Sequence, residues 1–187
     1  MSIFLGGSEI SGMYLGSNEI SEMYLGGNLI YSPGWPYKTL RISTDGGITW
    51  EDYGRPVVLS TNQFSGKGIT HVELPDSLTS LGSSAFANNN IKNIELPDSL
   101  TSVGPFSFEN NELESLYIPE SVKTIGITAF RSNNFTYIDF PETLEEIGTR
   151  AFTRSPKLSE VRVSYQTSYT RSGSSATFDT FTNIIRY

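Results

Sequence analysis

Hydrophobic residues in the centre of the chain recur with a period of 22 residues. The clearest marker is a series of phenylalanines, each 22 residues after the one before: Phe64, Phe86, Phe108, Phe130 and Phe152. A period of roughly 20 to 50 residues indicates a solenoid, in which one supersecondary unit is stacked on the next. We therefore predict a solenoid with the phenylalanines in one internal row, an architecture that offers an extended surface for binding.

Four repeats align, and they share one order of apolar and polar positions. They read ITHVELPDSLTSLGSSAFANNN (69–90), IKNIELPDSLTSVGPFSFENNE (91–112), LESLYIPESVKTIGITAFRSNN (113–134) and FTYIDFPETLEEIGTRAFTRSPK (135–157). Apolar residues at the first, fourth and sixth positions predict a short strand with one buried face, which the proline ends. The glycine of each repeat is expected in a turn with positive φ, and the Ala-Phe pair on a short helical or irregular segment.

The repeat also predicts the ends of the solenoid. Phe64 belongs to a degenerate first coil, and after Lys157 the repeat pattern fades into a Ser-, Thr- and Tyr-rich segment that we interpret as a C-terminal cap, because terminal repeats need a polar outer face. Asparagine runs at 88–90, 110–111 and 133–134 are expected to hydrogen-bond in turns between coils rather than to bind a ligand.

The repeats resemble BspA-like leucine-rich repeats, which occur in bacterial surface proteins and other adhesins. The shared core, LP-x-S-L-x-x-I-G-x-x-A-F, is matched over about residues 57–165 by LPDSLTSLGSSAF, LPDSLTSVGPFSF, IPESVKTIGITAF and FPETLEEIGTRAF. Ser107 departs from it, because the other repeats have alanine there. The resemblance implies a solenoid used for binding.

A second repeat, of ten residues, opens the chain as IFLGGSEISG (3–12), MYLGSNEISE (13–22) and MYLGGNLIYS (23–32). Each copy predicts a strand and a Gly-containing hairpin-type turn. So small a sheet needs a partner to be stable, so we expect it to pack on copies of itself or on another protein; a meander docked on the rest of the chain is the alternative. The residues expected to mediate this association are Tyr14, Leu15, Ile20, Tyr24, Leu25 and Ile30.

The ten-residue repeat resembles N-terminal segments of tailed-bacteriophage virion proteins, such as head and tail fibres. This resemblance implies that residues 1–32 anchor the chain to capsid or tail proteins or form a homo-oligomer, with three chains as the usual number in phage fibres. The solenoid would then be the displayed part.

Residues 33–56 form the predicted connection between the two repeats. Pro33, Gly34 and Pro36 mark a linker, and ISTDGGITW (42–50) predicts a hairpin around Asp45-Gly46-Gly47. The segment from Ser43 to Trp50 also resembles the Asp-box of sialidases, which is a structural turn. One copy implies the turn and no sialidase activity.

The predicted fold is thus mainly β with short helical segments. It has a β-strand repeat module at 1–32, a linker with a β-hairpin at 33–56, and a leucine-rich-repeat solenoid of about four 22-residue coils with caps at 57–187.

Composition narrows the functional classes. The chain has 187 residues, a net charge of −7, a sequence pI near 4.7 and no cysteine, which argues against nucleic-acid binding, disulfides and thiolate metal sites. Neither a signal peptide nor an apolar run long enough to cross a membrane is recognisable. Since the chain begins with Met1, we expect assembly in the host cytoplasm, as for a virion protein, and no membrane insertion.

No catalytic constellation is recognisable. The single histidine, His71, is expected on the outer face of a strand, and no phosphate-binding, dinucleotide or calcium motif occurs. Glu73 and Glu95 are expected about 5 Å apart on neighbouring coils, a pairing that repeats produce automatically. We predict no enzyme activity, no cofactor and no metal.

The predicted function is a bacteriophage virion appendage or decoration protein whose solenoid adheres to a host-surface protein or glycan. The proposed contact residues lie on the outward strand positions: Glu73, Glu95, Tyr117, Tyr137 and Asp139. Two alternatives remain open, a bacterial BspA-like surface adhesin and a structural decoration protein without a ligand.

Overall fold

The computed structural model describes residues 38–169, 176–179 and 183–187, together with four short strands between residues 3 and 31. It divides the chain into two compact units, residues 1–37 and 38–187. In the first unit, β1 (Ile3–Leu5), β2 (Ser8–Ser11), β3 (Met23–Leu25) and β4 (Asn28–Tyr31) pair antiparallel in that order. The first and third copies of the ten-residue repeat therefore each contribute a two-stranded hairpin, while the second copy lies outside the described residues.

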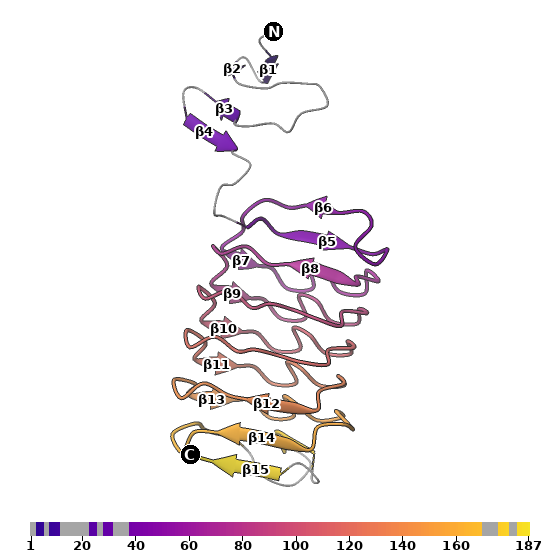
Figure 1. The fold of residues 1–187 in the computed structure, drawn as a ribbon, viewed down its shortest axis with the longest axis vertical. Coiled ribbons are helices and arrows are strands. Elements are labelled where there is room, and N and C mark those ends of the chain that lie inside the picture. The colour runs from indigo at the N-terminus through magenta and orange to yellow at the C-terminus, as the bar shows by residue number, and fades with distance from the viewer. Residues whose placement is uncertain are drawn as a thin grey trace. The chain divides into compact units, whose positions relative to one another are not determined.

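In the second unit, one side of the solenoid is a parallel ladder of very short strands. It consists of β7 (Val58–Leu59), β9 (Ser80–Leu81), β10 (Ser102–Val103), β11 (Thr124–Ile125) and β13 (Glu146–Ile147). Figure 1 shows these strands one above another along the solenoid. Leu81 pairs with Val103 and Val103 with Ile125, so the register of the ladder is the 22-residue period of the sequence.

The opposite side, which we call the strand wall, comprises residues 71–73, 93–95, 115–117, 137–139, 160–163 and 183–186. In its later part β12 (Tyr137–Asp139), β14 (Glu160–Val163) and β15 (Asn183–Arg186) form a parallel sheet. In its earlier part only β8 (His71–Glu73) is a strand. The strands predicted at 91–96 and 113–118 are absent from these described segments. Ile94 and Leu116 are nevertheless buried. The spacing of the apolar residues therefore predicts which side chains face the core, although the backbone here does not pair as a strand.

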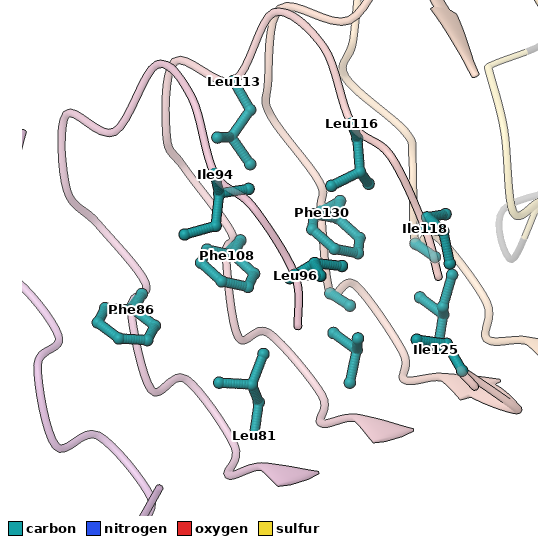
Figure 2. Close-up of a cluster of buried hydrophobic side chains, with 14 of the residues drawn as sticks. Leu81, Phe86, Ile94, Leu96, Phe108, Leu113, Leu116, Ile118, Ile125 and Phe130 are labelled. Atoms are coloured by element: carbon teal, nitrogen blue, oxygen red, sulfur yellow. The ribbon is translucent and has the colours of Figure 1, made fainter. Parts of the chain in front are cut away.

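The phenylalanine row predicted from the sequence is confirmed. Successive rings from Phe64 to Phe152 stack with centroids 5.3 to 5.4 Å apart. Figure 2 shows three of them in line between aliphatic side chains of the strand wall and of the parallel ladder. Phe178 adds a further ring, 5.7 Å from Phe152. The solenoid therefore continues into the segment that the sequence marked as a cap.

Two local predictions about the repeat are corrected by the structure. The Ala-Phe segments are turns, which agrees with the irregular alternative and not with the helical one, and no helix occurs among the described residues. The repeat glycines do not have positive φ; that conformation falls two residues later, for example at Ser84 and Phe106. Glycine is needed instead for close approach, because a Cβ at Gly104 would lie 2.3 Å from the carbonyl oxygen of Leu81 in the preceding coil.

Buried asparagines join the coils as predicted. The side-chain oxygen of Asn111 accepts a hydrogen bond from the Ile91 amide at 3.1 Å, and its amide group donates to the carbonyls of Phe86 and Phe108. Asn89 and Asn133 make the equivalent bonds one coil before and one coil after. These side chains satisfy backbone groups that the turns leave buried.

The predicted hairpin is formed by β5 (Arg41–Ser43) and β6 (Glu51–Asp52). Its turn is organised by Asp45, whose carboxylate accepts hydrogen bonds from the Thr49 hydroxyl at 2.6 Å and from the Ile48 and Thr49 amides. These bonds, that from the Thr49 hydroxyl foremost, hold the pKa of Asp45 well below its usual range. Because β5 also pairs antiparallel with β8, the hairpin adds to the strand wall.

Candidate functional site: a groove on the strand wall

A groove of about 600 Å³ lies where the strand wall is interrupted. It extends over the outward positions of the first three coils and reaches the hairpin. Its lining residues are Lys38, Trp50, His71, Val72, Glu73, Leu74, Asn93, Ile94, Glu95, Ser115 and Tyr117. In the described structure no backbone hydrogen bond joins 93–95 to 71–73 or to 115–117, so this face is not closed by a sheet.

Two aromatic side chains from different elements line the groove. Tyr117 belongs to the third coil and is 71% exposed. Trp50 follows the hairpin turn; its indole Nε1–H donates to the Gly47 carbonyl at 3.1 Å, and the Arg41 guanidinium lies 4.8 Å from its ring centroid. The His71 ring lies at 74° to the same ring, with centroids 6.2 Å apart. Trp50 is therefore held in place by the protein's own contacts.

The charged groups of the groove are paired. Glu73 forms an ion pair with Arg41 at 3.1 Å, and Glu95 with Lys38 at 3.2 Å. Both cations come from the hairpin segment, while both carboxylates come from the coils. The repeat alone would leave two neighbouring carboxylates facing solvent, and the hairpin supplies their counter-charges.

A second hollow of about 280 Å³ shares His71 and Asn93 with the groove. It also has Gly46, Thr70, Asn90, Lys92 and Glu112 in its lining. Lys92 and Glu112 lie 3.9 Å apart, so the charges of this hollow are matched as well. The two hollows together follow the strand wall across the first three full coils.

The structure brings together three of the five predicted contact residues. Glu73, Glu95 and Tyr117 line the groove, whereas Tyr137 and Asp139 lie on β12, outside its lining. Asp139 is paired with Arg162 at 3.4 Å. Of the predicted association residues, Tyr24 and Leu25 lie on β3 and Ile30 on β4; Tyr14, Leu15 and Ile20 lie outside the described residues.

Sequence reasoning missed Lys38 and Trp50 as members of the site. Their place depends on the pairing of β5 with β8, between residues about 30 positions apart in the chain, such as Ile42 and Val72. The Asp-box-like pattern was the available signal, because it fixes the turn that presents Trp50.

The groove also contains a histidine and two carboxylates. His71 is exposed, and its Nδ1 lies 3.1 Å from the Thr70 hydroxyl, while the two groove carboxylates are engaged by cations.

Among the described residues no group of three or more His, Cys, Asp or Glu side chains could hold a metal ion. No helix in the described part of the chain is long and apolar enough to cross a membrane.

Comparison with known proteins gives a family and a fold neighbour. The profile of the family described as BspA type Leucine rich repeat region matches residues 58–183 in 6 copies. A crystallised leucine-rich repeat protein from Bacteroides ovatus ATCC 8483 is 20% identical, with a TM-score of 0.49. The alignment covers 71% of this chain and 49% of that one, so the chain spans about half the length of this neighbour. No curated protein matches the chain.

Proposed function

The chain belongs to the BspA-type leucine-rich repeat family, and on that basis we propose that it is a recognition protein that adheres to a host surface through the groove on its strand wall. The observation that carries the proposal is the interruption of the wall between β8 and β12, where Trp50 and Tyr117 line an open groove. Aromatic side chains with a polar tip offer large contact area at low entropic cost.

The proposed role is non-catalytic. Glu73 and Glu95 resemble the paired carboxylates of glycosidases only in being neighbours, because each is held by its own cation at 3.1 to 3.2 Å. A glycosidase needs one carboxyl group to protonate the glycosidic oxygen and a second to attack the sugar or activate water, whereas both groove carboxylates are engaged by cations. We therefore expect binding without turnover and without a cofactor.

We further propose that the protein is a bacteriophage virion component, either a head or tail fibre or a decoration protein. The support is the ten-residue repeat, which resembles phage virion segments and whose first and third copies pair as β1 to β4 within one unit. Residues 1–32 would attach the chain to capsid or tail proteins or to further copies of itself, with a trimer as the expected oligomer. The solenoid would be carried on the particle, towards the host.

Adhesion of the purified full-length chain to intact host bacteria tests the recognition role. Tyr117→Ala should weaken adhesion about tenfold, whereas Tyr165→Ala, at a tyrosine that is 67% exposed in the C-terminal part of the chain, should leave it unchanged. Equal adhesion of both variants and the unaltered chain would place recognition elsewhere. Finding no adhesion by the unaltered chain would favour a ligand-free structural protein.

The virion role has its own test. Mass spectrometry of purified phage particles should detect the chain, and deletion of residues 1–32 should remove it from the particles while the solenoid still folds. Detection of the chain on the bacterial surface, with none in the particles, would instead support a bacterial adhesin.

A further inference from the structure

We infer that the groove binds a neutral oligosaccharide. This inference rests on the proposed recognition role and adds the chemical class of the ligand. It follows from three observations about the groove and the adjoining hollow, namely their charge balance, their aromatic lining and their free uncharged polar groups.

The charge balance excludes strongly charged ligands. Three carboxylates at this face are matched one to one by three cations within the described residues, as Glu73–Arg41, Glu95–Lys38 and Glu112–Lys92, at 3.1, 3.2 and 3.9 Å. A polyanion would meet no free cation here and would be repelled by a chain of net charge −7. A polycation would have to displace the cations that already occupy the carboxylates.

The aromatic lining suits a ligand with flat apolar patches. Tyr117 is exposed on the wall, and Trp50 is fixed by its hydrogen bond to Gly47 and by Arg41. A sugar ring presents C–H groups on its faces and hydroxyls around its rim, so it can contact both aromatic side chains while its hydroxyls remain hydrogen-bonded. Because Trp50 is already positioned, little side-chain entropy is lost on binding.

Uncharged polar groups complete the site. Asn93 and Ser115 are exposed, and neither makes a side-chain hydrogen bond within the described part of the chain. Amide and hydroxyl groups both donate and accept, as the hydroxyls of a sugar require.

The dimensions favour a short chain of sugar rings over a single ring. The groove of about 600 Å³ lies within the usual range of roughly 300 to 1,000 Å³ for small-ligand sites. A second hollow of about 280 Å³ adjoins the groove at His71 and Asn93. A linear oligosaccharide could therefore lie across the first three full coils.

The indole of Trp50 is a built-in probe for this inference. The chain has two tryptophans, so Trp35→Phe in the full-length protein leaves fluorescence from Trp50 alone. Titration with maltotriose, cellotriose and N-acetylchitotriose should change that fluorescence saturably for at least one of them. Heparin fragments and oligolysine should leave the fluorescence unchanged.

Matched variants decide whether the groove is responsible. Adding Tyr117→Ala should weaken sugar binding about tenfold, equivalent to about 1.4 kcal/mol, and adding Tyr165→Ala should change it less than twofold. Lys38→Gln frees the Glu95 carboxylate from its cation, so it should create oligolysine binding that the chain with Lys38 intact lacks.

Three results would overturn the inference. They are an unchanged Trp50 signal with every neutral sugar, equal loss of binding in the Tyr117 and Tyr165 variants, or binding of heparin or oligolysine by the chain with Lys38 intact. If any of these results occurred while Tyr117 remained necessary for adhesion to bacteria, the proposed recognition role would stand, and only the assignment of a neutral oligosaccharide as the ligand would be wrong. Absence of any adhesion by the unaltered chain would remove both.

Discussion

The earlier and later halves of the strand wall are made from the same repeat, yet they have different structures. In the later half, residues 137–186, Tyr137 pairs with Glu160 and Glu160 with Asn183 in a parallel sheet. Across this sheet Arg162 contacts Asp139 at 3.4 Å and lies 5.2 Å from the ring of Tyr187. In the earlier half, residues 71–117, only β8 is a strand, and the wall leaves the groove open.

This difference shows that burial and wall structure are set by different positions of the repeat. Inward positions are apolar in every coil, and the core passes beneath both halves without a break. Outward positions vary, and contacts made by neighbouring segments decide what forms there: the hairpin in the earlier half and the C-terminal strands in the later half. The repeat thus supplies a common core, and the outward residues determine where a ligand can bind.

The largest expected effect tests whether one core supports both halves. Phe108 stacks on Phe86 and Phe130 at 5.4 Å on each side, so Phe108→Ala should cost about 3 to 5 kcal/mol in free energy of unfolding by chemical denaturation. Phe64→Ala should cost less, because Phe64 is the first ring of the row and a neighbouring phenylalanine of the row stacks on only one of its faces. An equal or larger cost at Phe64 would contradict a continuous core.

The next effect tests the asparagines that join the coils beneath the open wall. Asn111→Ala would leave the buried Ile91 amide without its partner, and an unsatisfied buried group costs about 1 to 3 kcal/mol. Asn90→Ala is the matched control, because among the described residues its side chain bonds only to Glu112 on the surface, and its cost should stay within about 0.5 kcal/mol. Equal costs in thermal or chemical unfolding would mean that the buried asparagines do not hold the coils together.

A smaller effect concerns acid and the hairpin that borders the open half. The folded-state pKa of Asp45 is lowered, chiefly by the Thr49 hydroxyl, so its carboxylate stabilises the hairpin above the ordinary pKa of about 4. This contribution is lost as the pH falls below that value. In the Trp35→Phe chain, Trp50 fluorescence should therefore report loosening of the hairpin in acid before the core unfolds. Asp45→Asn should show the loosened signal already at pH 7, and an unaltered acid profile in that variant would count against this role.

The smallest expected effect tests whether the ion pairs of the groove contribute to the stability of the fold. Lys38 and Glu95 are paired, but their side chains are 56% and 89% exposed, so Lys38→Gln should change the free energy of unfolding by less than about 1 kcal/mol. The Arg131–Glu109 pair is shorter, at 2.6 Å, and less exposed, so Arg131→Gln should cost more. The reverse order would mean that the groove's ion pairs are structural.

Sequence reasoning succeeded where one residue type has one role in every coil. The phenylalanine row and the inter-coil asparagines both follow from a period that tolerates little variation. The turn of the hairpin could also be predicted, since Ser43, Asp45 and Thr49 act locally within seven residues.

The site was only partly predictable because it depends on contacts between distant segments. Glu73, Glu95 and Tyr117 could be assigned to one face from their spacing, but Lys38 and Trp50 join them only through the pairing of β5 with β8. The missing strands at 93–95 and 115–117 could not be foreseen either, because alternation of apolar residues reports which side is buried and not whether the backbone pairs. Phe178 was not predicted as a member of the phenylalanine row, because it follows Phe152 after 26 residues and so does not fit the 22-residue period.

Amide hydrogen exchange of the free full-length chain tests most directly the claim that one repeat builds an open and a closed half. Amides of 93–95 and 115–117 should exchange much faster than the amides of β12 and β14 that are hydrogen-bonded in the parallel sheet, although Ile94, Leu116, Ile138 and Val161 are all buried. Equal, strong protection of both sets would show that the wall is a continuous sheet, and it would contradict the open groove on which the proposed recognition site depends.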